Sequence, residues 1–335
     1  MAAAFATAQR QTHFDSNQRT CLLTINSLVP TLRDQIMTQL NCEHLTQQLQ
    51  TKPSNKVHIW SELKLMAFTR TFASIYSTCI LVLTLRVQLN IVGGCIYSRH
   101  ENENDSQLTE EECAVQQQYL EAIRYFMENG VLKLCDLIQH SVEKEVLNIS
   151  LKQSLTKQSL KMLIDRIRIN IEKLPNDVKK TPFLAFICES TPFVHHGSHQ
   201  SSESINGRML FSLSNLMQET YDIISSEDYH YVLQSMINHG FDYLLTHISR
   251  VFASATPRIP ASLETRASSE NMALPSLPLA KLIPPFVGSV HNVCSDTTTE
   301  YLQQLISLAV ANDYAFEIYK SFCCSSNAVN TITMS

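Results

Sequence analysis

The sequence predicts an all-α fold, and two observations support this prediction. Apolar residues recur at spacings of three and four along most of the chain, which is the period of one face of an α-helix. Glycine is scarce: the 335 residues include seven, and none lies between Met1 and Val92. Because tight β-turns need glycine for positive φ angles, such a chain contains few hairpins. The 44% of hydrophobic residues suffices for one large or two small domains.

The first ninety residues predict two helices joined by a loop. The apolar positions of the first helix are Ile25, Leu28, Val29, Leu32, Ile36 and Leu40. Pro30 lies inside this pattern and is expected to kink the helix or to mark an early turn. The segment 50–55 contains Pro53 and is predicted as a loop that ends in a helix cap. The second helix begins with Ile59, Leu63 and Met66.

Glycines are interpreted as helix ends. The second helix is expected to run to about Ile91, where Gly93 and Gly94 close it. Gly130 and Gly240 follow apolar periodic segments and are predicted as residues just past a helix C-terminus, where a left-handed conformation is common.

Helical spacing continues in the rest of the chain. Helices are predicted over Val115–Val146, Leu155–Ile171, Leu210–Met217, Val232–Leu245 and Tyr301–Phe322. The segment Leu277–Pro285 brings apolar residues next to prolines and is expected to be extended or a broken helix, packed on another element. Polar stretches at about 100–112, 190–204 and 255–272 are predicted as flexible loops.

Composition excludes several classes of protein. A net charge of -5 offers no basic surface for nucleic acid. The ten cysteines lack C-x-x-C spacing and are expected to be reduced core thiols. The N-terminus lacks the features of a secretory signal. The most apolar stretch, Thr71–Leu85, is shorter than the roughly 20 residues that span a bilayer, so it is predicted to be a buried core helix.

Motifs of catalysis are absent from the sequence. It contains no P-loop, G-x-G-x-x-G, G-x-S-x-G or H-E-x-x-H pattern, and we expect no enzyme activity and no cofactor. His195, His196 and His199 are close enough in sequence to share a metal ion, with Glu189 and Glu203 nearby. Because this cluster lies in a serine-rich loop with nothing rigid to fix its geometry, we expect no metal site there.

The neighbourhood of Trp60, the single tryptophan, has the composition of a helix-binding groove. Apolar walls are expected from Leu45, Leu49, Ile59 and Leu63. Lys56 and Lys64 are expected to form a cationic rim, and the turn at Pro53 to hold two helices at an angle. Such a groove takes the apolar face of an amphipathic helix. Composition alone leaves a second interpretation open, in which Trp60 belongs to the core.

Several strings resemble the peroxin-3 family of peroxisomal biogenesis factors. They are Arg10–Cys21, Pro53–Lys56, Tyr76–Cys79, Leu85–Ile91, Val115–Leu120 and Ser276–Lys281. The resemblance covers nearly the whole chain, is strongest up to Ile96 and is weak from about Lys173 to Ser204.

The resemblance implies a single large twisted bundle of long helices over residues 1–335. It also implies a role without catalysis: the family docks peroxin-19, the farnesylated carrier of new peroxisomal membrane proteins, at the cytosolic face of the peroxisomal membrane. An N-terminal amphipathic helix of the carrier occupies the groove. Carried over by motif, the groove residues are Trp60, Leu49, Leu63, Thr46, Lys56, Ile96 and Lys281; Lys64, which is expected on the rim from its position beside Trp60, completes the predicted partner-binding residues.

Two departures from the family pattern bear on function. Gln50 stands where familiar members carry a second lysine after the groove leucine, which is expected to weaken electrostatic steering modestly. The family's N-terminal membrane anchor is also missing, because Met1 corresponds to a point near the end of the anchor's linker. The alternative function is therefore a soluble helical scaffold that keeps the fold without membrane docking, which would be cytosolic if the chain is complete as given.

Overall fold

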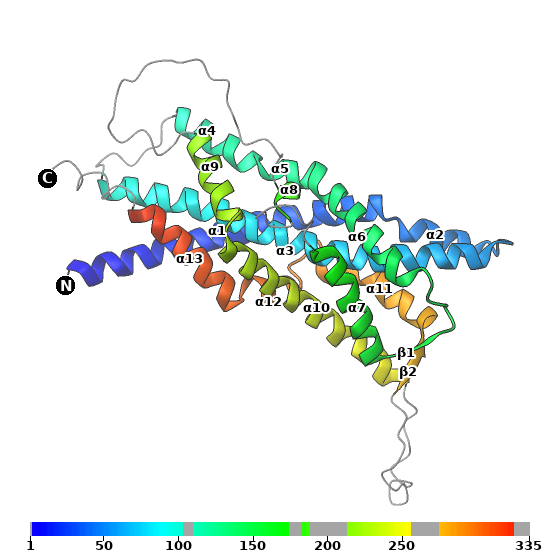
Figure 1. Ribbon diagram of the computed structural model, residues 1–335. Coiled ribbons are helices and arrows are strands. Elements are labelled where there is room, and N and C mark those ends of the chain that lie inside the picture. Colours follow the sequence, from blue (N-terminus) through cyan, green and yellow to red (C-terminus); the bar gives the residue numbers. More distant parts are fainter. Residues whose placement is uncertain (1, 103–109, 174–182, 188–212, 256–274, 325–335) are drawn as a thin grey trace, which may run out of the picture.

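The computed structural model describes residues 2–102, 110–173, 183–187, 213–255 and 275–324 (Figure 1). Within these ranges the chain is helical apart from one short two-stranded sheet, which confirms the all-α prediction. The N-terminal helices are α1 (Ala2–Gln39), α2 (Cys42–Gln50), α3 (Lys56–Asn102), α4 (Glu110–Glu121) and α5 (Ile123–Tyr125). A π-helical turn, η1 (Phe126–Gly130), leads into α6 (Val131–Val146), which is followed by α7 (Lys157–Glu172) and α8 (Leu184–Ile187). The C-terminal helices are α9 (Leu213–Ile224), α10 (Glu227–Ala255), α11 (Leu279–Val293), α12 (Glu300–Ile306) and α13 (Ala309–Cys324).

Helix α3 is the axis of the bundle. It packs against α1, α2, α6, α10, α11 and α13, and every residue from Ala67 to Cys95 is buried. The predicted burial of Thr71–Leu85 is therefore confirmed. Helix α3 is long and apolar enough to cross a membrane, but 94% of its most apolar 18-residue segment is buried inside the protein. Its apolar character is that of a core helix with neighbours on all sides.

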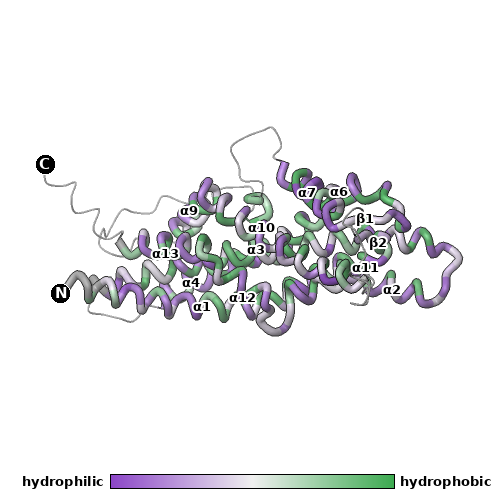
Figure 2. The backbone as a smooth tube through the Cα atoms, turned by 90° about the horizontal axis from the view of Figure 1, so that it is seen from below, coloured by the Kyte–Doolittle hydropathy of each residue, from purple (hydrophilic) through white to green (hydrophobic). Residues whose placement is uncertain are grey.

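The turn between α2 and α3 lies at one end of the elongated bundle. The beginning of α1 and the end of α13 lie at the other end (Figure 1), and the view from below shows the same separation of α2 from the beginning of α1 (Figure 2). At this turn Lys52 has a φ of 51°, the left-handed conformation of a tight reversal. The Asn41 side chain caps α2 by accepting a hydrogen bond from the His44 amide at 2.9 Å. The predicted loop at 50–55 is thus confirmed for residues 51–55.

The four glycines that were predicted as helix ends, Gly93, Gly94, Gly130 and Gly240, are sites of close contact with a neighbouring element, which corrects that prediction. Helix α3 continues through Gly93 and Gly94, Gly240 lies inside α10, and Gly130 leads directly into α6. A Cβ atom on Gly94 would lie 2.6 Å from the Tyr319 carbonyl oxygen of α13. A Cβ on Gly130 would lie 2.0 Å from the Phe186 carbonyl oxygen. Glycine is therefore needed here because another backbone approaches the helix, with no requirement for positive φ.

Other boundaries differ from the sequence predictions for local reasons. Helix α1 runs on through Pro30. The predicted helix 301–322 is two helices, because α12 ends at Ile306 and α13 begins at Ala309; the Ser307 hydroxyl hydrogen bonds to the Gln304 carbonyl oxygen at this break. The segment 277–285 divides: β2 (Ser276–Pro278) pairs antiparallel with β1 (Ser154–Thr156), and α11 then contains Pro284 and Pro285.

The predicted flexible loops lie mostly outside the described residues. The range 190–204 lies wholly outside them, together with the histidine cluster His195, His196 and His199. At the other two loops, α3 extends to Asn102, α4 begins at Glu110 and α10 ends at Ala255. Cys21, Cys42, Cys79, Cys95, Cys135, Cys294 and Cys323 are buried free thiols, as expected for core thiols, whereas the free thiol Cys113 is exposed.

Gly94→Ala is expected to destabilise the fold by about 1 to 3 kcal/mol, because the new methyl group meets backbone and Phe322 atoms between α3 and α13. Gly288→Ala is the matched control: it lies in α11, where no atom of a neighbouring element lies within 4 Å of the position that the methyl carbon would take. There the higher helix propensity of alanine should leave stability unchanged or raise it by up to about 1 kcal/mol. Urea denaturation measures both, and equal effects would contradict the packing argument.

Glu43→Gln is expected to lower stability by about 1 to 2 kcal/mol at neutral pH. The Glu43 carboxylate accepts hydrogen bonds from Arg70 Nη1 at 2.7 and 2.9 Å, and the Arg70 side chain is fully buried while that of Glu43 is 43% exposed. Partial burial raises the pKa of Glu43, but the Arg70 hydrogen bond and charge outweigh this and lower it overall.

A lowered carboxyl pKa has a defined consequence for acid stability. The stabilisation from Glu43 is present above its unfolded-state pKa and is lost as the pH falls through its lowered folded-state value. The difference in unfolding free energy between wild type and Glu43→Gln should therefore shrink at acid pH. A difference that stays constant down to the acid transition would show that the ion pair does not supply the effect.

Candidate partner-binding surface

The first turns of α3 carry an apolar stripe at the end of the bundle. Val57 and Trp60 are three residues apart, and Lys64 is one further turn along, so the three lie on one face of the helix. Val57 is 79% exposed, and Trp60 is half-buried and packs against the main core. This arrangement combines the two interpretations of Trp60: the indole is anchored in the core and also open to solvent, as interface tryptophans commonly are.

The side chains expected to form the groove walls differ in burial: some lie in the core and others at the surface. Leu45, Ile59 and Leu63 are at most 5% exposed and form the core beneath the surface. Leu49, near the end of α2, is half-buried and packs on the same core as Trp60. Thr46 is exposed, but its hydroxyl donates to the Cys42 carbonyl oxygen of its own helix at 2.9 Å. The residues that can reach a partner from α2 and α3 are therefore fewer than the motif suggested.

Lys64 is not a rim cation, which corrects the sequence prediction. The residue is 1% exposed, and its ammonium donates to the carbonyl oxygens of Val146, Leu147 and Ile149 at 2.8, 3.1 and 2.8 Å. Burial lowers the pKa of Lys64. Since these carbonyls belong to the C-terminal end of α6 and the turn after it, Lys64 holds that turn against α3.

The turn held by Lys64 adds a residue that sequence reasoning missed. Leu147 is 55% exposed, and its carbonyl is bound by the lysine one helical turn from Trp60. Its place beside α3 follows from a contact between residues 83 positions apart, so no sequence signal indicated it. Val57 was also missed, although its spacing from Trp60 on a helix was a usable signal.

Lys281 lies on the other side of the same turn. The Ala280 amide, in the first turn of α11, donates to the Leu151 carbonyl oxygen at 3.0 Å, two residues beyond the Ile149 carbonyl that Lys64 binds. Lys281 is exposed, and so is Lys56 at the start of α3. Lys56 is next to Val57 in the sequence and Lys52 lies in the preceding loop, so both place positive charge close to the apolar stripe, while Lys281 follows the residue that bonds to Leu151.

Ile96 does not belong to this surface. It lies on the same helix as Trp60 but 36 residues further on, a separation of about 54 Å at the rise of an α-helix. It is half-buried and packs on the core. We define the terminal surface as the half-buried Leu49 and Trp60 and the exposed Val57 and Leu147, together with the exposed Lys56 and Lys281.

Comparison with known proteins identifies the class of protein. The chain is 37% identical to the peroxisomal biogenesis factor 3 of Cricetulus longicaudatus over 326 residues, which is 95% of this chain and 85% of the relative. It is 37% identical to the factor of the same name from Homo sapiens over 327 residues, with the same coverage. The peroxisome biogenesis protein 3-2 of Arabidopsis thaliana is 22% identical over 309 residues, 89% of this chain and 79% of the relative. These matches place the chain among peroxisome biogenesis factors.

The family model named Peroxin-3 matches residues 3–56, 51–99 and 95–321. The chain belongs to the Peroxin-3 family.

Lys64→Met is expected to destabilise the protein by about 2 to 3 kcal/mol, because three buried carbonyl oxygens lose a charged donor. Lys56→Met, at an exposed position one residue from Val57, is the control and should change stability by less than about 0.5 kcal/mol. Thermal or urea unfolding gives both values. If the two substitutions have the same small effect, the buried role assigned to Lys64 is wrong.

Proposed function

We propose that this chain is a docking receptor for peroxin-19, the carrier of peroxisomal membrane proteins, and that the terminal surface holds an amphipathic helix of the carrier. The observation that carries the proposal is the exposed apolar stripe of Val57 and Trp60 on α3, extended by Leu147 and bordered by Lys56 and Lys281. Membership of the Peroxin-3 family supports a role in peroxisome biogenesis.

The chemistry of the terminal surface suits one face of a helix. Apolar side chains at spacings of three and four on the partner would cover Trp60, Val57 and Leu147, which solvent otherwise contacts. Acidic residues beside that face would meet Lys56 and Lys281, which are exposed and therefore contribute more to the rate of association than to affinity. Gln50 is exposed and neutral, so the surface has one cation fewer than the family pattern.

The proposed role requires no catalysis. The receptor supplies a binding surface at the cytosolic face of the peroxisomal membrane, and release of the carrier's cargo delivers a protein to that membrane. The position of the terminal surface supports this arrangement, since it lies at the opposite end of the bundle from the beginning of α1 (Figure 1). A membrane attachment at the N-terminal side would leave the surface free for a carrier from the cytosol.

Trp60→Ala is expected to weaken binding of a peptide with the sequence of the carrier's N-terminal helix by about 2 to 4 kcal/mol, the range of an interface hot spot. Isothermal titration calorimetry on the full chain measures the affinity. Equal affinities for wild type and variant would remove Trp60 from the site.

Because Trp60 also packs on the core, a second variant separates binding from stability. Val57→Glu adds a charge at a side chain that is 79% exposed, so the fold is kept and peptide affinity should fall at least tenfold. Tyr231→Ala is the control, at an exposed aromatic residue on α10 outside the terminal surface. If neither wild type nor Tyr231→Ala binds the peptide, the chain is a helical scaffold without docking, and the proposal fails.

A further inference from the structure

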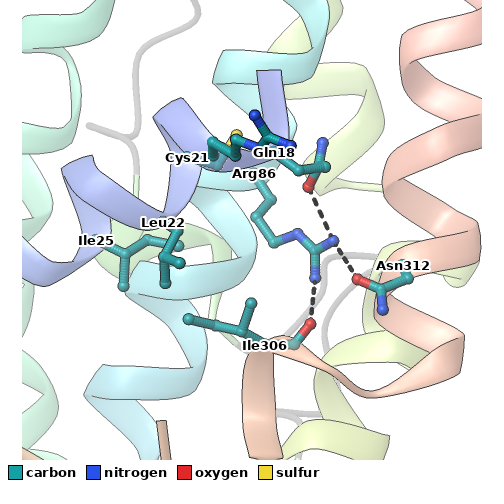
Figure 3. Close-up of a pocket in the computed structure, with 8 residues that line it drawn as sticks. Gln18, Cys21, Leu22, Ile25, Arg86, Ile306 and Asn312 are labelled. Carbon is teal, nitrogen blue, oxygen red and sulfur yellow. Dashed lines mark hydrogen bonds between the residues drawn. The ribbon is translucent and has the colours of Figure 1, made fainter. Parts of the chain in front are cut away.

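A second candidate site lies at the middle of the bundle, where α1, α3, α12 and α13 meet. A cavity of about 220 Å³ opens there between side chains of α1 and the connection from α12 to α13. Figure 3 shows Cys21, Leu22 and Ile25 on one side of the cavity, with Asn312 on the other and the Arg86 guanidinium between them. Arg86 is 26 residues from Trp60 on α3, about 39 Å along the helix, so the cavity is independent of the terminal surface.

Arg86 is the functional group of this cavity. The residue is 2% exposed. Its Nη1 donates to the Ile306 carbonyl oxygen at 3.2 Å, and Nη2 donates to Gln18 Oε1 at 3.0 Å and Asn312 Oδ1 at 2.6 Å (Figure 3). All three acceptors are neutral. A guanidinium has five N–H groups, so these three bonds leave two unused, and one of these is the buried Nε, which has no hydrogen-bond partner among the described residues.

The positive charge of Arg86 is not neutralised within the described part of the chain. None of the eight residues that line the cavity is acidic, and Arg19 adds a second cation at its exposed edge. Cys21 does not supply a negative charge, since burial raises the pKa of its thiol to about 12 despite the nearby guanidinium. Burial lowers the pKa of Arg86, yet a guanidinium stays protonated in proteins. An unpaired buried charge of this kind is costly, and an anion in the cavity would offset that cost.

The rest of the lining determines what kind of anion fits. Cys21, Leu22, Ile25 and Ile306 make most of the wall apolar. The amides offer few free donors: Gln18 Nε2 already donates to Asn90 Oδ1 at 2.8 Å. A phosphate dianion, with three charged oxygens to satisfy, suits this wall poorly. One carboxylate beside the single buried guanidinium, with a short aliphatic chain on the apolar wall, matches this lining in charge and polarity.

We propose that the cavity between α1, α3 and the α12–α13 connection binds a small carboxylate with a short aliphatic chain, with the carboxylate at Arg86 and the chain against Leu22 and Ile25. The cavity volume limits the ligand to a molecule of a few carbon atoms beyond the carboxylate. Occupation would also join α1 to the α12–α13 connection through the ligand, in addition to the bonds that Arg86 makes.

Titration of the full chain with hexanoate tests the proposal, by calorimetry or by ligand-observed saturation-transfer NMR. Hexanol has the same number of carbon atoms without the charge, and inorganic phosphate has charge without the aliphatic chain. Hexanoate should bind saturably, and each of the other two should bind at least about tenfold more weakly. Equal affinity for hexanoate and hexanol, or tighter binding of phosphate, would overturn the assignment of the ligand class. Absence of saturable hexanoate binding would overturn the site.

Two neighbouring substitutions on α1 locate the binding. Leu22→Trp fills the cavity without removing a hydrogen bond of Arg86, and it should abolish hexanoate binding. Leu23→Trp is the matched control, because Leu23 is 70% exposed and does not line the cavity. Both variants should bind the carrier peptide as wild type does, so failure here is distinguishable from failure of the docking proposal. Hexanoate affinity that is the same in the two variants would place the ligand elsewhere.

Discussion

The central part of α3 is completely buried, and the packing of the other helices follows from this. From Ala67 to Cys95 no side chain of this helix faces solvent, so its polar groups can find partners only inside the protein. Ser77 Oγ and Arg86 Nε have none among the described residues, whereas most of the other polar groups do. Some bond within the helix, as Thr71 does to the Ala67 carbonyl oxygen at 2.9 Å. Others tie α3 to a neighbour, as Thr84 does to the Tyr229 hydroxyl at 2.9 Å. Gly93 and Gly94 let α1 and α13 approach α3 closely.

One candidate site lies where the burial of α3 ends, and the other lies where a buried cation of α3 has no partner of opposite charge. At the first turns of α3 the surrounding helices stop, and Val57 and Trp60 are left partly open while their helix remains anchored. At Arg86 the burial is complete, but the partners are carbonyl and amide oxygens with no negative charge among them. The first site is therefore an apolar surface suited to a partner's side chains. The second is a small cavity with an unneutralised cation.

The lysines show how far the sequence could lead at the terminal surface. Lys56 and Lys64 are two helical turns apart and look equivalent in the sequence, yet one is exposed and the other is 1% exposed. The difference arises because the end of α6 packs over Lys64 and presents three carbonyl oxygens to it. The same packing brings the Leu147 carbonyl oxygen to Lys64, one helical turn from Trp60, and the Ala280 amide at the start of α11 donates to the Leu151 carbonyl oxygen in the segment that follows. Ile96 shows the opposite case. The family motif predicted it in the groove, but the length of α3 separates it from Trp60.

Local features of the sequence were enough to predict that the chain is helical, that Thr71–Leu85 is core and that the segment at Pro53 turns the chain close to Trp60. These properties depend on local periodicity, glycine content and turn residues, which short stretches of sequence express directly. Long-range packing, in contrast, is the reason that Gly93, Gly94, Gly130 and Gly240 lie at close helix contacts, that Lys64 is a buried donor and that Arg86 borders a cavity. Each of these properties depends on which atoms of a distant segment come within a few ångströms of the residue, and the sequence near the residue does not indicate those contacts.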